Sequence, residues 1–321
     1  MIEVNNLTKN YGLFTALKGI SFHIKKGEVI GFLGPNGAGK TTTMRILTCF
    51  MPPSSGRAIV AGYDVFSDSL AVRKRVGYLP ENVPLYPEMT AHGYLKYMAK
   101  IKGTPQKELT SCINYVMNAC GLEDRQHQII GQLSKGYRQR VGLAQSLIHN
   151  PDVIILDEPT SGLDPRQVIE IRELIKELGK NRTIILSTHI LAEVSLTCER
   201  VIVINEGEIA GDVQLSNGGV SSIERASSTQ PSLNSSNTLD LEIHGNTQEI
   251  ESTLAGIPRV DVIDIRNSIY RVSYPSDVDP RSEISSTIIS NGWQLLEMRS
   301  VKMTIEEVFL HLTTRDHQLP A

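Results

Sequence analysis

The stretch FLGPNGAGKTTTMRIL, residues 32–47, joins an apolar segment to a helical one through a glycine-rich loop with one lysine at its end. The pattern G-x-x-x-x-G-K-T over residues 34–41 predicts a phosphate-binding loop between a buried strand and a helix. Backbone N–H groups of such a loop and the helix dipole converge on an anion. Lys40 would contact the β and γ phosphates, and the Thr41 hydroxyl would bind Mg²⁺. The alternative is a plain strand-to-helix turn with a surface lysine, which the strand, loop and helix order disfavours.

A second apolar stretch ends in two acids. In PDVIILDEPTSGLDP, residues 151–165, the apolar run predicts a strand buried on both faces that ends at Asp157 and Glu158. Ligands of parallel α/β sheets lie at the carboxyl ends of strands, so we expect Asp157 to share Mg²⁺ with Thr41. Glu158 would face the attacking water as a general base, a role worth about 10²–10⁴ in rate. The alternative is a solvated strand end, which the buried run before it argues against.

Two more stretches carry polar residues at element ends. QLSKGYRQRVGLAQSLIHNP, residues 132–151, places Ser134 and Gly136 at the start of an amphipathic helix, a second helix N-terminus suited to phosphate. TIILSTHI, residues 183–190, predicts a buried strand that ends near His189, which could hydrogen-bond near a γ-phosphate. Taken separately, the serine is an ordinary N-cap and the histidine an ordinary strand-end residue.

In this order, the four stretches resemble the ATP-binding subunits of ABC transporters, and the resemblance covers residues 1 to about 212. It implies ATP and Mg²⁺ as cofactors and an ATPase activity. It implies catalytic roles for Lys40, Glu158 and His189, metal ligation by Thr41, Asp157 and Glu81, and a D-loop at residues 161–164. Tyr11 would stack on adenine, although it could also be a partly buried loop residue. The nucleotide-binding residues that it implies are Tyr11, Gly34, Pro35, Asn36, Gly37, Ala38, Gly39, Lys40, Thr41, Thr42, Ser134 and Gly136.

Two motifs depart from the family pattern. The signature is LSKGY where the family usually has LSGGQ, so Lys135 and Tyr137 replace a glycine and a glutamine while Ser134 is kept. The usual glutamine of the Q-loop is Glu81, which keeps an oxygen ligand and adds a negative charge. The segments YLPEN and PLYPEMT resemble the branch that serves ABC-2-type exporters, including multidrug, sodium-efflux and gliding-motility systems.

The remaining segments complete an α/β fold. Alternating segments near the N-terminus predict an antiparallel β layer beside the P-loop ABC ATPase core, and residues of about 88–132 predict a helical subdomain. Residues 1–213 would form the nucleotide-binding domain. Residues 214–238 contain eight serines in 25 positions, a composition typical of a linker. Residues 239–321 alternate as strand, helix, strand, strand, helix, strand, the order of a small α+β ferredoxin-like domain.

Composition limits the partners. The net charge of −3 gives no basic excess, so we expect no nucleic acid partner. No apolar run approaches the ~20 residues that span a bilayer, so the chain would meet the membrane only through a separate integral-membrane permease. The resemblance implies a homodimer in the ATP state and a cytoplasmic, peripheral position at the inner face of the cell membrane. The alternatives are a soluble non-transport ABC ATPase and a nucleotide-binding regulator that does not hydrolyse ATP, against which Glu158 argues.

Overall fold

The computed structural model describes residues 1–216, 219–224, 236–266, 269–275, 279–301 and 304–313. Contacts within the chain divide it into two compact units, Met1–Ala210 and Gly211–Ala321. Each unit has its own hydrophobic core. The division falls close to the predicted boundary at residue 213.

The central sheet of the first unit has a parallel part with the strand order β9-β3-β8-β7-β6. Its strands are short, and β3, β7, β8 and β9 are almost wholly buried because helices and the second sheet cover both faces. The register pairs Leu33 with Thr188 and Asp157 with Ser187, so β3, β7 and β8 end at the same edge. The strand bounds are β3 (Val29–Leu33), β6 (Val76–Leu79), β7 (Val153–Asp157), β8 (Thr183–Thr188) and β9 (Arg200–Asn205).

An antiparallel sheet of order β2-β1-β4-β5 lies beside this core, as predicted. Helix α1 lies between the two sheets: its Met44, Ile46 and Leu47 share one core cluster with residues of both. The phosphate loop is thereby supported from two sides. The bounds are β1 (Ile2–Tyr11), β2 (Phe14–Ile24), α1 (Lys40–Leu47), β4 (Ser55–Val60), β5 (Tyr63–Asp64) and α2 (Ser69–Arg75).

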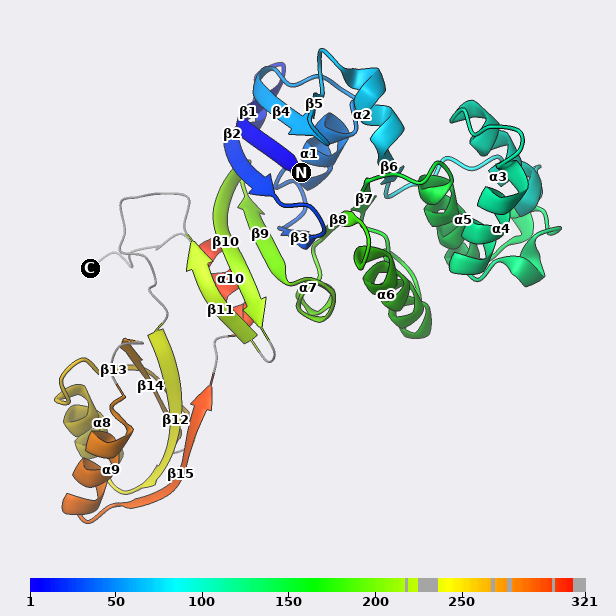
Figure 1. Cartoon of the computed structure of the whole chain (residues 1–321). Coiled ribbons are helices and arrows are strands. Elements are labelled where there is room, and N and C mark those ends of the chain that lie inside the picture. Colours follow the sequence, from blue (N-terminus) through cyan, green and yellow to red (C-terminus); the bar gives the residue numbers. More distant parts are fainter. Residues whose placement is uncertain (217–218, 225–235, 267–268, 276–278, 302–303, 314–321) are drawn as a thin grey trace. The chain divides into compact units, whose positions relative to one another are not determined.

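Helices α3, α4 and α5 group together at one end of the first unit (Figure 1). Thr90, directly before α3, caps that helix by accepting a hydrogen bond from the Gly93 N–H. Helices α6 and α7 follow β7 and β8 in the chain. The bounds are α3 (Ala91–Ile101), α4 (Leu109–Ala119), η1 (Glu123–Arg125), η2 (Ile130–Gln132), α5 (Lys135–Leu147), α6 (Pro165–Gly179) and α7 (Leu191–Thr197).

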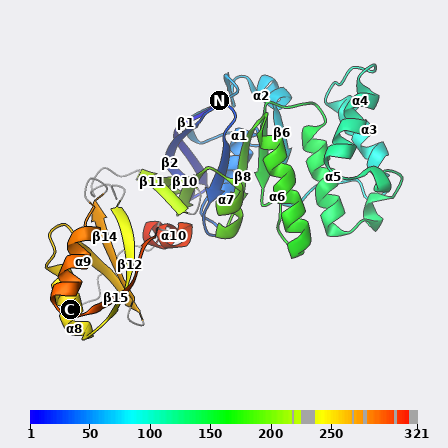
Figure 2. The same cartoon turned by 60° about the horizontal axis from the view of Figure 1, so that its bottom comes forward.

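The second unit contains a four-stranded antiparallel sheet of order β13-β14-β12-β15, with α8 and α9 on one face (Figure 2). Leu239 and Leu241 of β12 pack against Ile250 of α8 and Ile284 of α9. The predicted order strand, helix, strand, strand, helix, strand is confirmed. The bounds are β12 (Ser236–His244), α8 (Thr247–Ala255), β13 (Asp261–Arg266), β14 (Ile269–Pro275), α9 (Arg281–Ser290), β15 (Gln294–Val301) and α10 (Ile305–Thr313).

The segment expected to be a linker contains strands. β10 (Glu208–Ser216) runs into it, β11 (Gly219–Glu224) lies within it, and the two pair antiparallel with Val213 opposite Ile223. Backbone hydrogen bonds hold such a pair whatever the side chains are, so the serine content was a poor guide to structure here. The rest of the expected linker, 225–235, lies outside the described residues.

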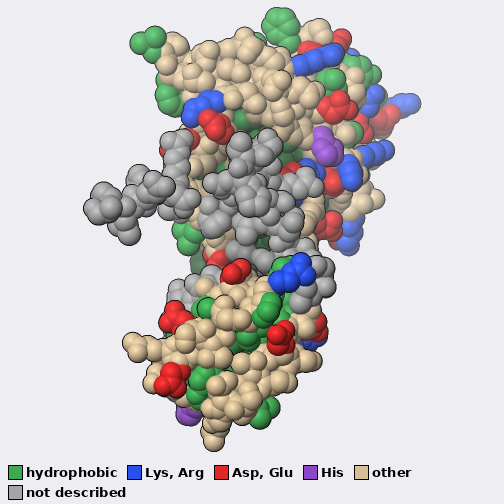
Figure 3. All heavy atoms as spheres, turned by 90° about the vertical axis from the view of Figure 1, so that its left-hand side faces the viewer, with side chains coloured by type: hydrophobic (Ala, Val, Ile, Leu, Met, Phe, Trp, Pro, Cys, Tyr) green, Lys and Arg blue, Asp and Glu red, His purple; other side chains and the backbone are tan. Residues whose placement is uncertain are grey.

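Basic and acidic side chains are interspersed on the part of the first unit that Figure 3 shows. Among the described residues, no helix combines the length and the apolar character needed to cross a membrane.

Candidate functional site

The phosphate loop turns from β3 into α1 through backbone conformations that favour glycine. Gly37 and Gly39 have φ angles of +81° and +113°. A Cβ at Gly34 would lie 2.2 Å from the Ile204 carbonyl oxygen, so no larger residue fits there. Gly39 is the N-cap of α1 and has no side chain to accept from the first-turn N–H groups. The loop therefore offers helix-end N–H groups and a positive dipole end to an anion.

Lys40 is the first residue of α1, and its side chain turns back into the loop. Its Nζ donates to the Gly34 carbonyl at 2.7 Å and to the Pro35 carbonyl at 3.2 Å. It also lies 3.5 Å from Oε1 of Glu158, and both side chains are less than 10% exposed, at 6% and 8%. The lysine thus places one buried positive charge between the loop and the end of β7.

Asp157, the last residue of β7, meets Thr41 at the start of α1. Its Oδ1 accepts from the Thr41 hydroxyl at 3.2 Å and from the Ser187 hydroxyl at 2.5 Å. Its Oδ2 is buried and has no hydrogen-bond partner among the described residues. A hydroxyl beside a carboxylate with one uncommitted oxygen is a donor set that suits Mg²⁺, which prefers hard oxygen ligands and few protein groups. The structure therefore brings two of the three predicted metal ligands together, and they fit the ion.

Glu158 follows in a left-handed backbone conformation, with φ of +50°. Its N–H donates to the carbonyl and the hydroxyl of Ser187, at 3.1 and 3.2 Å. Nδ1 of His189 lies 2.9 Å from Oε2 of Glu158, so this carboxylate lies between a lysine and a histidine. Non-glycine residues adopt this conformation rarely, and such strain gathers at functional sites.

Other predicted residues lie on separate elements. Ser134 is exposed at the N-cap of α5, where its Oγ accepts from the Tyr137 N–H at 3.4 Å. A Cβ at Gly136 would lie 2.5 Å from the Gln167 side chain, so the signature segment packs tightly against the start of α6. Among the described contacts, no hydrogen bond or ion pair joins Ser134 or the exposed Glu81 to the phosphate loop.

Tyr11 ends β1 and is 44% exposed. Its hydroxyl contacts the Met51 sulfur at 3.1 Å, and the Lys9 ammonium lies 5.6 Å from its ring centroid. One face of the ring is therefore shared with a cation, and the side chain is open enough to take a flat ligand.

Ser187 was missed by the sequence analysis. It binds Asp157 and Glu158 from the neighbouring strand β8, two residues before His189. A serine near the end of an otherwise apolar strand was the available signal.

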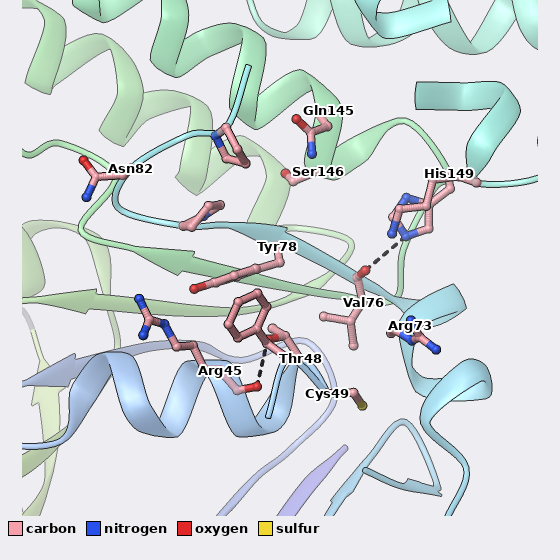
Figure 4. A pocket seen from close by; sticks show the side chains of 14 residues that line it. Arg45, Thr48, Cys49, Arg73, Val76, Tyr78, Asn82, Gln145, Ser146 and His149 are labelled. Carbon is pink, nitrogen blue, oxygen red and sulfur yellow. Dashed lines mark hydrogen bonds between the residues drawn. The ribbon is translucent and has the colours of Figure 1, made fainter. Parts of the chain in front are cut away.

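A cavity of about 690 Å³ lies near the Q-loop segment, between the end of α1, β6 and the end of α5 (Figure 4). Arg45, Arg73, Lys102 and His149 line it, and none of the described lining residues is acidic. Burial and the charge of Arg73 lower the pKa of Lys102. Burial, followed by the charge of Lys102, lowers the pKa of His149 to about 4. Its Nε2 contacts the Val76 carbonyl at 3.1 Å, and its buried Nδ1 has no partner among the described residues.

Tyr78 lines the cavity and lies close enough to Asp157 to feel its charge. Burial raises its pKa to about 12, and the negative charges of Asp157 and Glu81 add to this effect. The phenol therefore stays neutral and can donate a hydrogen bond.

Comparison with known proteins agrees with this geometry. Residues 17–161 match the family model described as ABC transporter. The chain is 30% identical over 310 residues to the ABC transporter ATP-binding protein YxlF of Bacillus subtilis, which covers 97% of this chain and 98% of that protein. It is 38% identical over 215 residues to the bacitracin transport ATP-binding protein BcrA of Bacillus licheniformis, covering 66% and 69% of the two chains.

A solved structure shares the cassette fold. The dimeric post-hydrolysis state of the ATP-binding cassette MJ0796, bound to ADP and Pi, is similar with a TM-score of 0.62 and 28% identity, over 67% of this chain and 99% of that one. The phosphate loop, the acid pair that ends β7 and a similarity that runs along nearly the whole sequence lead to one conclusion: the chain belongs to the ABC transporter ATP-binding proteins, the ATP-hydrolysing subunits that power transport through a separate membrane subunit.

Proposed function

We propose that this chain binds MgATP in the phosphate loop, pairs with a second copy in the ATP state, and uses hydrolysis to drive export through a membrane permease. The observation that carries the proposal is the buried Glu158 carboxylate, set between Lys40 and His189 at the edge where β3, β7 and β8 end. A strained acid beside a phosphate cradle is suited to chemistry on water rather than to simple nucleotide storage.

Each residue of the site would have a separate role in the reaction. Thr41 and Asp157 would hold Mg²⁺, which when bound neutralises charge on the phosphate oxygens. Lys40 and the helix-end N–H groups would hold the β and γ phosphates. Glu158 would accept a proton from the attacking water as the bond between the γ phosphorus and ADP breaks. His189 would keep the Glu158 carboxylate oriented, with the proton of its Nδ1 directed at Oε2.

The second copy would complete the site. Ser134 stands exposed at the N-cap of α5, with the buried Gly136 in the first turn, at a helix end suited to an anion. Under two-fold symmetry, the signature of each chain would meet the phosphate loop of the other, so one contact forms twice. The similar cassette, dimeric in a post-hydrolysis state bound to ADP and Pi, supports the pairing of two copies. Lys135, whose Nζ lies against Gly162 of the D-loop in the same chain, would be carried into the interface with them.

The permease would dock beside the Q-loop segment. Tyr86 is 48% exposed and lies two residues after Pro84, which lines the cavity, and aromatic side chains of this kind anchor interfaces. The name of one relative, the linearmycin resistance ATP-binding protein LnrL of Bacillus subtilis, supports export as the direction. The chain would then lie on the cytoplasmic face of the membrane, held there by its permease.

Light scattering on the Glu158→Gln protein tests the dimer. We expect a dimer with MgATP and a monomer with MgADP, because only ATP offers the γ-phosphate that Ser134 would hold. Adding Ser134→Arg should abolish the ATP dimer through bulk and misplaced charge. Ser111→Arg, at an exposed serine of α4, is the matched control and should leave the dimer intact. A dimer that forms equally with ADP, or that survives Ser134→Arg, would contradict the proposal.

A further inference from the structure

Glu193, in the first turn of α7, is a buried carboxylate that the proposed mechanism does not use. Its residue exposure is 6%. Oε2 accepts a hydrogen bond from the Thr188 hydroxyl at 2.7 Å, and Oε1 accepts one from the Thr160 hydroxyl. Among the described residues, no basic side chain forms an ion pair with it. A buried acid that relies on two hydroxyl groups is costly to keep, so its position calls for an explanation.

The two threonines belong to the segments that carry the reacting groups. Thr160 lies two residues after Glu158, and Thr188 lies directly before His189. Thr188 Oγ1 also accepts from the Ile190 N–H at 3.1 Å, so it fixes the backbone on both sides of His189. One carboxylate therefore joins the loop after β7 to the loop after β8. The contact between Glu158 and His189 is a second link between the same two segments.

Glu193 is itself held, through its helix α7, against β3, the strand that leads into the phosphate loop. Val194, the next residue of α7, packs against β3 so closely that a Cβ at Gly31 would lie 1.9 Å from its Cγ1. Helix α7 cannot shift without disturbing β3. Through α7, Glu193 thus links both loops to β3, the strand that leads into the phosphate loop and Lys40.

The backbone conformation of Glu158 requires contacts such as those of Glu193 to hold it. Its φ of +50° is unfavourable for a residue with a side chain, and surrounding contacts must hold it. The Ser161 N–H donates to the Glu158 carbonyl and the Leu163 N–H to the Thr160 carbonyl, each at 3.1 Å, so the loop is a tight turn. The position of this turn depends on how Thr160 is held. Release of Thr160 would let the turn relax and move the Glu158 carboxylate.

We propose that Glu193 is a positioning residue for hydrolysis, which sets the distance between Glu158 and His189 by holding Thr160 and Thr188. The inference rests on the proposed roles of Glu158 and His189. It predicts a loss in kcat without a matching change in nucleotide affinity, because Lys40, Thr41 and the loop N–H groups keep their places.

The test compares Glu193→Ala with Glu193→Gln in the full-length protein. A misplacement of about 1 Å can cost about 100-fold, so Glu193→Ala should lower kcat by about 10- to 100-fold while KM for ATP stays within about two-fold. Glutamine can accept from one threonine and donate to the other, so Glu193→Gln should restore most of the rate. Ser195→Ala, on the exposed side of the same helix, is the control and should behave as wild type.

A double-mutant cycle separates positioning from general loosening of the fold. Thr160→Val removes the donor at constant shape, and it should lower kcat in the wild type but add little in the Glu193→Ala background. Circular dichroism at the assay temperature confirms that each variant is folded. An unchanged kcat in folded Glu193→Ala, a rise in KM that accounts for the loss, or additive effects of the two changes would each overturn the inference. If Glu193→Ala and Glu158→Gln both hydrolyse ATP at the wild-type rate, the proposed mechanism itself fails. If Glu193→Ala hydrolyses ATP at the wild-type rate and Glu158→Gln does not, only this inference fails.

Discussion

Nδ1 of His189 and Oε2 of Glu158 are 2.9 Å apart, although the two residues are 31 positions apart in the sequence. The contact depends on the pairing of β7 with β8, which brings the two strand ends to one edge of the sheet. Because Lys40 lies at the other carboxylate oxygen, Glu158 is constrained on both sides. A carboxylate held in this way can direct its lone pair at one point, as a general base requires.

Replacing this base should stop turnover and spare binding. Glu158→Gln keeps the size of the side chain and removes its basicity, so we expect hydrolysis to fall by about 10²–10⁴ with little change in ATP affinity. Phosphate release measures the first quantity and a fluorescent nucleotide titration the second. Turnover near the wild-type rate would remove Glu158 from its role.

Lys40 should matter for affinity instead. A hydrogen bond to a charged group contributes about 1.5–3 kcal/mol, so Lys40→Ala should raise the Kd for MgATP by roughly 10- to 100-fold. Calorimetry at millimolar Mg²⁺ gives this value directly. Lys26→Ala, at an exposed lysine outside the loop, serves as the control and should bind normally. Equal affinity in both variants would count against the phosphate cradle.

Tyr86 should affect coupling more than chemistry. Its ring contacts those of Tyr94 and Tyr97, with centroids 5.8 Å apart in both cases, so Tyr86→Ala should also lower the melting temperature slightly. Basal ATPase activity should stay near wild type, whereas binding to the permease should weaken by at least about 10-fold, as expected for an interface anchor. Tyr97→Ala removes part of the same aromatic cluster and should destabilise without uncoupling. Co-purification with the permease and transport assays decide; if both survive Tyr86→Ala, the docking surface lies elsewhere.

His149 should make stability depend on pH. Its pKa is about 4 in the folded chain, below the ordinary 6.5, because burial disfavours the charged form. The unfolded chain therefore takes up the proton first, so this contribution to stability is complete above pH 6.5 and is lost as the pH falls toward 4. Between these limits, wild type should lose about 1–3 kcal/mol more than His149→Gln, which cannot titrate. Urea unfolding of both proteins at pH 7 and 4.5 measures the difference, and parallel losses would refute it.

Much of the architecture could be predicted from local pattern. The residues of the phosphate loop are consecutive, and their backbone conformations favour glycine, so the motif together with the strand before it and the helix after it identified the loop. The antiparallel layer and the order of elements in the second unit were likewise predicted from alternation of apolar residues, and the structure confirms them. The functional roles assigned to the individual site residues stay predictions.

The supporting contacts could not be predicted in the same way. Ser187 reaches Asp157 across 30 positions, and Glu193 reaches Thr160 across 33, through strand pairing and helix placement that one sequence does not reveal. The β10–β11 pair was missed for a different reason: composition suggested a linker where backbone hydrogen bonds form a hairpin. In both cases the structure is decided by how strands and helices pair in the folded chain rather than by residue type.

The two carbonyl oxygens that hold the Lys40 ammonium belong to the loop whose purpose is to receive phosphate. The chain itself therefore fixes the ammonium in place, so a phosphate that enters the loop meets a charge whose side-chain entropy has already been lost. Such preorganisation lowers the cost of binding.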